Sequence, residues 1–448
     1  MAATVAIFLI WKLTSLHFRF GDENVYFYMT HAIQHGLLPY KDFFLADPPF
    51  FIFLLTGFKA LIGTHYLLFK TLPPLFDAAS AVLIYLILIR NSTRFAWLGP
   101  AFYLFSFSVL STSDYMTGAE VMIFFILLAN LLDQHGKSFW SGVSWALACL
   151  CKLYAAPALI GFLIYKLLKR ERHALRNIIL GGILAALIVL LPFFIMAPHQ
   201  TLYDLILHQF HRPAGINKWN VWQLFLGFEW LLILAACVGA YYTKHRTLVF
   251  ELALSAIFLL WYKDLYYLYL HLLMPYLALL AAEFVSSLSV KKSELAWGFI
   301  GLYVVILMYP LLTYTSTFAP QGIFENPQEI ADALRLAPKS LPAYGAQEVA
   351  PLVALMADRP IFENIIDTNT QNFAAGTHNL KNISADIQKS GAYLISRIAD
   401  YPDQGVTDIG YESYFDPNVF TSSCTKFKAF TRPNPADLLN DVTIYTCL

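Results

Sequence analysis

Apolar runs separated by short polar connections dominate the first 315 residues of the chain. Eleven of them approach or reach the length needed to cross the roughly 30 Å hydrocarbon core of a bilayer. They cover residues 2–18, 66–89, 95–112, 118–133, 138–151, 154–168, 175–196, 221–242, 247–262, 265–285 and 295–315. The pattern predicts a polytopic α-helical membrane protein with about eleven transmembrane helices.

Composition agrees with this class and divides the chain in two. Only 13% of the 448 residues are charged and the mean hydropathy is +0.55, whereas a soluble protein carries about 25% charged residues. Residues 1–315 hold 21 Lys and Arg against 15 Asp and Glu, and residues 316–448 hold 9 against 15. We therefore expect a transmembrane domain at 1–315 and a soluble domain at 316–448, with no nucleic-acid partner.

The segment 48–63 decides the predicted topology, because counting it as a span would invert everything that follows. It is shorter than the roughly 20 residues that a crossing helix needs, and Lys59 interrupts it. If it stays at the membrane surface, twelve basic residues fall in short connections on the side of the N-terminus, and only eight fall on the other side. The positive-inside rule then places the N-terminus inside. The first loop (19–65) and the C-terminal domain lie outside.

Residues 316–448 alternate between strand-like and helix-like segments, which predicts an α/β domain. We expect strands at 341–344, 359–366 and 392–396, and helices at 347–356 and 383–389. Cys424 and Cys447 lie in this predicted outer domain, where a disulfide is permitted. Cys149, Cys151 and Cys237 fall in apolar spans and are expected to be ordinary core residues.

Acidic residues gather where the first loops meet the predicted outer membrane face. Asp22 and Glu23 follow the first span directly, Asp47 precedes a double proline, and Asp114 lies in the next outer loop. Carboxylates at a membrane are costly to bury and are usually functional. Their position suggests chemistry on a lipid-linked substrate at the bilayer surface.

Two lysines and a histidine-rich loop lie on the same predicted side. Lys152 and Lys263 occupy turns between short apolar runs, where they either snorkel to the interface or bind an anionic lipid headgroup. The loop 197–219 holds three histidines at 199, 208 and 211 together with Arg212 and Lys218. It has few carboxylates to complete a metal site, so an interfacial helix is favoured. The tyrosines at 262–276 are typical of an interfacial aromatic belt.

The first loop resembles that of the GT-C superfamily, integral-membrane glycosyltransferases that use polyprenyl-phosphate sugars. Residues 22–26 (Asp-Glu-Asn-Val-Tyr) are similar to its DExxY-like start, and residues 32–42 to its "A…G…PY.D" stretch. Asp47-Pro48-Pro49-Phe50 stands where the family has HPPL or KPPL, with Asp47 in place of the basic residue. The nearest branch is that of protein O-mannosyltransferases and lipid A aminoarabinose transferases, and the resemblance covers about residues 1–315.

Later segments match more loosely. Ser113-Asp114 stands where these enzymes carry a second acid. Residues 142–157, with Lys152, resemble a "GLA…TK…P" helix pair. Residues 267–275 resemble a late "Y…P" helix start that approaches the lipid phosphate.

The resemblance implies transfer of a sugar, with inversion, from a polyprenyl-phosphate donor to an acceptor hydroxyl at the outer face of the plasma membrane. Asp22 would be the general base. Glu23 would orient it or contact the acceptor. Asp114 would bind acceptor hydroxyls, and a divalent metal ion held by Asp22 and Asp114 is left open.

The departing phosphate gains charge, so cations and hydroxyl donors should surround it. The candidates are Lys152, Arg212, Lys263 and Tyr267, with Asp47 as a further substrate-binding residue. The acceptor could be a glycan, a lipid or a protein. The alternative function is a transporter or flippase for a lipid-linked sugar. It would require inverted repeats, and no internal repeat is present in the sequence.

Overall fold

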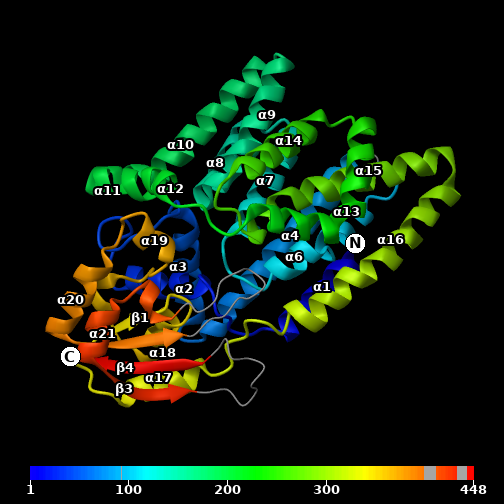
Figure 1. The fold of residues 1–448 in the computed structure, drawn as a ribbon. Helices are drawn as coiled ribbons and strands as arrows, with labels where there is room; N and C mark the ends of the chain where they lie inside the picture. The colour runs from blue at the N-terminus through cyan, green and yellow to red at the C-terminus, as the bar shows by residue number, and fades with distance from the viewer. Residues whose placement is uncertain (92, 398–409, 431–440) are drawn as a thin grey trace.

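The computed structural model describes residues 1–91, 93–397, 410–430 and 441–448, and within these ranges the chain is mainly helical (Figure 1). The elements before the C-terminal part are α1 (Ala2–Thr14), α2 (Glu23–Gln34), α3 (Phe50–Ile62), η1 (Tyr66–Thr71), α4 (Leu72–Arg90), α5 (Leu98–Leu104), α6 (Phe107–Thr112), α7 (Ala119–Gln134), α8 (Ser138–Cys151), η2 (Leu153–Ala155), α9 (Ala156–Leu168), α10 (Arg172–Met196), α11 (Pro198–Leu202), η3 (Tyr203–Leu207), α12 (His208–His211), α13 (Lys218–Tyr242), α14 (Arg246–Trp261), η4 (Tyr267–Leu273), α15 (Met274–Lys291), α16 (Ser293–Thr313) and η5 (Tyr314–Phe318).

Five helical segments of the described chain are long and apolar enough to cross a membrane: 66–90, 172–196, 218–242, 267–290 and 293–318. Within the most apolar 18 residues of each segment, 78% of the residues of 267–290 are buried, whereas only 22% of those of 172–196 and 17% of those of 293–318 are buried. Helices that expose so much apolar surface are stable only against lipid. The fold is therefore that of a multi-pass membrane protein, with further short apolar helices at 2–14, 50–62, 138–151 and 153–168.

Two predicted spans differ from the observed helices. The run 95–112 is divided into α5 and α6, because Ser106 adopts an extended conformation and its hydroxyl accepts a hydrogen bond from the Val109 amide. Glu229 of α13 accepts a second bond from the Ser108 amide at 2.9 Å, so the new helix start is satisfied inside the bundle. The run 265–285 begins as the three-ten helix η4 and becomes α-helical only at Met274.

The predicted surface segment 48–63 contains the helix α3, which runs from Phe50 to Ile62. One side of α3 is buried through Phe51, Ile52 and Leu55. Lys59, on the same side, donates to Gln34 of α2 at 2.6 Å. Helix α3 thus packs against α2 as part of the first loop.

The C-terminal part contains α17 (Pro327–Leu336), β1 (Ala343–Gly345), α18 (Ala350–Ala357), η6 (Phe362–Asn364), α19 (Thr370–Ala374), α20 (Leu380–Ser390), β2 (Ala392–Arg397), η8 (Tyr411–Ser413), α21 (Pro417–Ser423), β3 (Cys424–Phe430) and β4 (Val442–Cys447). The sheet order is β1-β2-β4-β3, with β1 and β2 parallel and the other pairs antiparallel. Cys424 and Cys447 face each other in this register and form a disulfide.

The predicted strand 359–366 is wrong. Only Ile361 makes an isolated bridge, to Ala343, and the chain then turns into η6. Asn364 and Glu363 both have positive φ, which breaks an extended path. The buried Arg359 explains the local order, because its guanidinium donates to the carbonyls of Leu334, Ala337, Pro338 and Leu341.

The C-terminal part docks directly on the first loop, beside α2 and α3 (Figure 1). Asn24 of α2 donates to the Glu348 carbonyl at 2.5 Å, and the Tyr28 hydroxyl accepts from the Ile361 amide at 2.9 Å. Both side chains are buried. This contact fixes α2 between the helical bundle and the sheet.

Helices α8 and α10 pack most closely where Gly142 of α8 meets the backbone of α10. A Cβ at Gly142 would clash with the Ile178 carbonyl of α10, which belongs to a helix backbone and cannot move aside. Gly142→Ala should therefore lower the free energy of unfolding by about 1–3 kcal/mol, measured by thermal unfolding in detergent. Gly298→Ala in α16, where no atom lies within 4 Å, is the control and should be neutral or slightly stabilising. Equal effects of the two changes would contradict this packing.

Candidate functional site

A cavity of about 1310 Å³ lies where the first loop, the helical bundle and the C-terminal part meet. Its walls come from α2, the turn after α8, the 205–217 loop, the segment 258–269 and residues 346–348 and 367–372. Five of the eight site residues predicted from sequence line it: Asp22, Asp47, Lys152, Arg212 and Lys263. Glu23, Asp114 and Tyr267 do not line it.

Asp22 immediately precedes α2, yet its carboxylate does not cap the helix and instead faces the cavity. It is exposed to the cavity space while protein surrounds it on most sides. Gln347 of the C-terminal part donates to Asp22 Oδ1 at 3.0 Å. Burial, reinforced by the nearby Asp367 and Glu348 carboxylates, raises the pKa of Asp22 to about 7 against the opposing charges of Lys152 and Arg212. A carboxylate with this pKa can exchange protons near neutral pH.

Asp47, Tyr26 and Lys152 form one hydrogen-bonded cluster on the cavity wall. Lys152 Nζ lies 2.6 Å from Asp47 Oδ2 and 2.9 Å from the Tyr26 hydroxyl, and Tyr26 donates to Asp47 at 2.6 Å. Lys152 ends α8 in an extended conformation, which turns its side chain toward the first loop. The contact explains why an acid stands before the double proline, since Asp47 neutralises and orients Lys152.

Arg212, which also lines the cavity, forms an ion pair with the buried Asp264 behind it. Arg212 Nη2 is 2.7 Å from Asp264 Oδ2. Gly215 lies against this carboxylate so closely that an added Cβ would clash with it. Lys263 remains exposed, and its ammonium donates to the Phe210 carbonyl at 3.0 Å. Arg212, Lys263 and Asp264 all lie in turns, so no helical periodicity in the sequence relates their positions.

Tyr267, predicted as a hydroxyl donor to the departing phosphate, does not line the cavity with Lys263. The segment 262–266 is not helical and η4 begins only at Tyr267, so no continuous helix sets the two side chains on one face. Tyr267 points instead to Ser108 in the bundle, at 2.9 Å. Three tyrosines that were expected only to form an interfacial belt, Tyr262, Tyr266 and Tyr269, line the cavity instead.

Glu23 is held in the bundle and does not fit its predicted catalytic role. Its side chain is fully buried, pairs with Lys70 at 2.5 Å and accepts from the Met116 amide at 2.8 Å. The helix turns Glu23 away from the cavity that Asp22 faces. Two adjacent acids thus take different roles, one at the cavity and one in the core.

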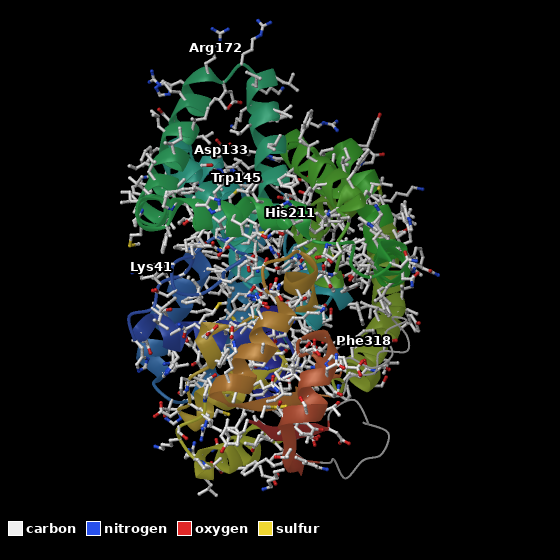
Figure 2. The ribbon with its side chains drawn as sticks, turned by 60° about the vertical axis from the view of Figure 1, so that its left-hand side comes forward. Lys41, Asp133, Trp145, Arg172, His211 and Phe318 are labelled. Carbon is white, nitrogen blue, oxygen red and sulfur yellow. A yellow bond between two sulfur atoms is a disulfide. The ribbon has the colours of Figure 1, made fainter. Side chains whose placement is uncertain are left out.

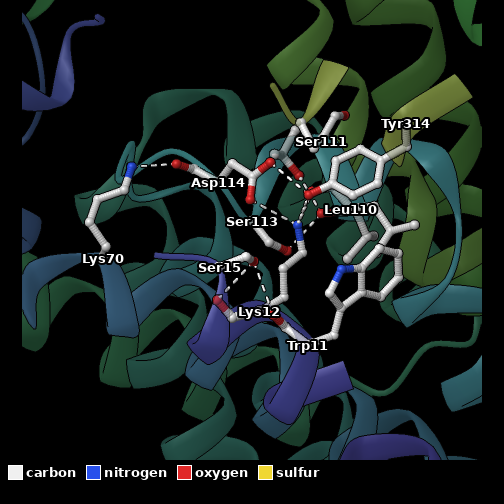
Figure 3. A network of polar contacts seen from close by, with 12 residues as sticks. Trp11, Lys12, Ser15, Lys70, Leu110, Ser111, Ser113, Asp114 and Tyr314 are labelled. Carbon is white, nitrogen blue, oxygen red and sulfur yellow. Dashed lines mark hydrogen bonds and ion pairs between the residues drawn. The ribbon is translucent and has the colours of Figure 1, made fainter. Parts of the chain in front are cut away.

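Asp114, predicted as a second catalytic acid, is largely buried and held in a network of ion pairs away from the cavity (Figure 3). Its carboxylate pairs with Lys12 at 2.9 Å and Arg19 at 3.2 Å, and it accepts a bond from the Tyr314 hydroxyl at 2.8 Å. Burial alone would raise the pKa of Asp114, but Lys12 and Arg19 hold it below its usual value. Asp114 therefore ties α1 to the segment that leads into the C-terminal part.

The arrangement does not fit a metal ion shared by Asp22 and Asp114, because cations and a hydroxyl already occupy the Asp114 oxygens. In the described part of the chain, no three His, Cys, Asp or Glu side chains are grouped to hold a metal. The histidine-rich loop 197–219, for which a helix was favoured over a metal site, contains the helical segments α11, η3 and α12. His208 Nδ1 lies 2.9 Å from Thr377 Oγ1 of the C-terminal part.

The C-terminal part forms one wall of the cavity, which was not predicted from the sequence. Gln347, Glu348 and residues 367–372 form one wall. No motif marks them, and they lie more than 300 positions from Asp22. Only docking on α2 brings them to the site.

No protein-family model and no curated protein sequence matches the chain. Among solved structures, ArnT from Cupriavidus metallidurans bound to undecaprenyl phosphate has a TM-score of 0.67 at 15% identity, covering 99% of this chain and 97% of that one. The apo structure of the same protein has a TM-score of 0.64 at 14% identity with the same coverage. The predicted resemblance to the lipid A aminoarabinose transferase branch is thus confirmed at the level of the fold.

The geometry of Asp114 predicts a structural phenotype. Asp114→Asn would leave Lys12 and Arg19 buried without a counter-charge, so the free energy of unfolding should fall by about 3 kcal/mol. Thermal unfolding in detergent measures this. Asp332→Asn, which breaks an exposed pair with Arg335, is the control and should change stability by less than about 1 kcal/mol. A stable, folded Asp114→Asn protein that has lost substrate turnover would restore Asp114 to a catalytic role.

Proposed function

We propose that this chain is a membrane glycosyltransferase, which transfers a sugar with inversion from a polyprenyl-phosphate donor to an acceptor hydroxyl at the outer membrane face. What supports this most directly is the cavity, which places a carboxylate with a pKa near 7 beside three cations. The fold shared with ArnT, captured with undecaprenyl phosphate, supports the donor class.

The cavity combines the two surfaces that a prenyl phosphate needs. Lys152, Arg212 and Lys263 supply positive charge for the phosphate. Apolar side chains of α9 and α14 continue the wall, and among them Ile160 is 50% and Trp261 83% exposed. An exposed apolar surface beside a charged pocket suits a lipid tail that remains in the bilayer while its headgroup enters the site.

Asp22 acts as the general base in this proposal. It takes the proton of the acceptor hydroxyl as the oxygen attacks the anomeric carbon, and the lipid phosphate leaves from the opposite face with the bonding electron pair. Lys152, Arg212 and Lys263 stabilise the charge that develops on the phosphate. Gln347 holds Asp22 through one carboxylate oxygen, which leaves the other free to accept the proton.

Asp47 positions Lys152 and does not replace the family's basic residue directly. Its carboxylate, shared with the Tyr26 hydroxyl, keeps the ammonium within the cavity when no phosphate is bound. A buried lysine without such a partner would lose its charge or turn toward solvent. Lys152 thus supplies the positive charge that the family's basic residue before the double proline would supply.

We further propose eleven spans in residues 1–315 and an outer soluble domain at 316–448 of a plasma-membrane protein. Arg172, within the most basic turn of the chain, lies at the end of the molecule opposite the strands (Figure 2). This separation supports a basic inner end and an outer C-terminal domain. In this proposed topology, Asp22 and the cavity lie toward the outer side.

The alternative function, a transporter or flippase for a lipid-linked sugar, has less support. A flippase must expose its lipid-linked sugar to both membrane faces in turn. Here the cavity is walled by the C-terminal part, which packs on α2 through buried hydrogen bonds. A fixed wall and a carboxylate suited to proton transfer favour chemistry over transport.

The donor can be identified by mass spectrometry of lipid-linked sugars in a strain that lacks the gene. Under the proposed function, one species should accumulate and should disappear when the wild-type gene is restored. An unchanged lipid profile would overturn the function. A species confined to the inner leaflet would favour the carrier.

Asp22→Asn should reduce transfer by about 10²–10⁴-fold, because an amide cannot accept the proton. With the donor identified above, wild-type kcat/KM should be level above pH 7 and fall about tenfold per unit below it, because protonated Asp22 cannot act as a base. Asp42→Asn, in the same loop but bonded to the Leu38 amide, is the control. Asp22→Asn activity within threefold of wild type would exclude Asp22 as the base.

Lys263→Ala should raise the donor KM and also lower kcat, because it removes a phosphate contact and leaving-group stabilisation together. Loss of one charged hydrogen bond corresponds to roughly ten- to hundredfold in kcat/KM. Lys218→Ala is the matched control, since Lys218 also donates to a backbone carbonyl but does not line the cavity. Unchanged kinetics of Lys263→Ala would remove Lys263 from the phosphate site.

A further inference from the structure

The segment 367–372, which follows η6 and includes the first residues of α19, is a continuous run of polar residues on the cavity wall. Most of its side chains are already engaged. Thr368 donates to the Gly345 carbonyl at 2.7 Å, and Asn372 donates to the Asp367 carbonyl at 3.1 Å. Asn369 accepts from the Gln371 amide at 2.9 Å. These bonds define the shape of the wall, and the polar atoms that make them are not available to bind a ligand.

Gln371 is the exception within this segment. Its side chain is only 9% exposed and lines the cavity. Its Oε1 atom is buried and has no hydrogen-bond partner in the described chain. A buried acceptor without a partner costs about 1–3 kcal/mol, so a ligand that supplies a donor here would recover that loss.

The position of Gln371 indicates which ligand group lies against it. Gln371 and Tyr266 both line the cavity. Burial raises the pKa of Tyr266, and the Gln371 amide is near enough to the Tyr266 hydroxyl to lower that pKa in part. Tyr266 lies beside the Arg212–Asp264 pair, and so beside the proposed phosphate site. The group attached to the phosphate of the donor is its sugar, whose hydroxyls are hydrogen-bond donors.

The wall that carries Gln371 is fixed to the helical part. His208 bonds to Thr377, and the Tyr203 hydroxyl donates to the Ala375 carbonyl at 3.5 Å. Gln371 is therefore held in place before substrate binds, as a residue that discriminates between substrates must be.

We propose that Gln371 Oε1 accepts a hydrogen bond from a hydroxyl of the donor sugar and so contributes to sugar selection. This role rests on the proposed function. It assigns to the C-terminal part a direct share in donor recognition. A sugar that lacks this hydroxyl would leave Oε1 unpaired, which is the physical basis of rejection.

The test measures equilibrium binding to the full-length protein in nanodiscs. The probes are undecaprenyl phosphate alone and undecaprenyl phosphate carrying glucose, galactose, mannose or arabinose. The wild type should bind at least one sugar-bearing probe more tightly than the bare lipid. Gln371→Met, which keeps the length and apolar contacts of the side chain, should reduce that preference about three- to tenfold and leave bare-lipid affinity unchanged.

Gln388→Met is the control, because Gln388 is exposed, does not line the cavity and donates to Ser423 on the surface. The inference is overturned if Gln371→Met keeps the full preference, or if the wild type binds the bare lipid but prefers none of the sugars. It is also overturned if Gln371→Met, shown to be folded by thermal unfolding, weakens all probes equally. Failure of the wild type to bind any of the five probes would instead count against the proposed function.

Discussion

Buried ion pairs between segments that lie far apart in the sequence hold this molecule together. An unpaired ion in low dielectric costs several kcal/mol, and the buried cations of the first loop and α1 meet carboxylates from distant segments. Lys70 pairs with Glu23, and Lys12 and Arg19 share Asp114. These pairs join the first loop and α1 to the bundle. They also anchor the chain on either side of Asp22, which is left to face the cavity.

The cavity is composite, because none of the three parts of the molecule could form it alone. The bundle provides cations at its turns, the first loop provides Asp22 and Asp47, and the C-terminal part provides a polar wall. Each cation has its own carboxylate or carbonyl partner, so the positive charge stays in place without substrate. Such preorganisation reduces the cost of ordering the site when substrate binds.

The distribution of breaks in the helices follows from the same site. Lys152 lies where α8 ends, and the segment 262–266 between α14 and η4 is not helical. Non-helical backbone at membrane depth is tolerated only where protein or a cavity satisfies its polar groups. These two breaks lie on the cavity wall, and they direct Lys152 and Lys263 toward the cavity, where a continuous helix would distribute its side chains around its axis.

From sequence alone one can predict the membrane class, the position of most long helices, the C-terminal α/β segment with its disulfide, and the resemblance that the fold confirms. Hydropathy, periodicity and the first-loop motif are local signals, and they also singled out five residues that line the cavity. The remaining features depend on contacts between distant segments. Whether Glu23 faces the site or the core depends on where Lys70 lies, and whether Tyr267 or Tyr266 faces the cavity depends on where a helix starts. Gln371 reaches the cavity only because a distant domain docks on α2, and contacts of that kind leave no trace in local sequence.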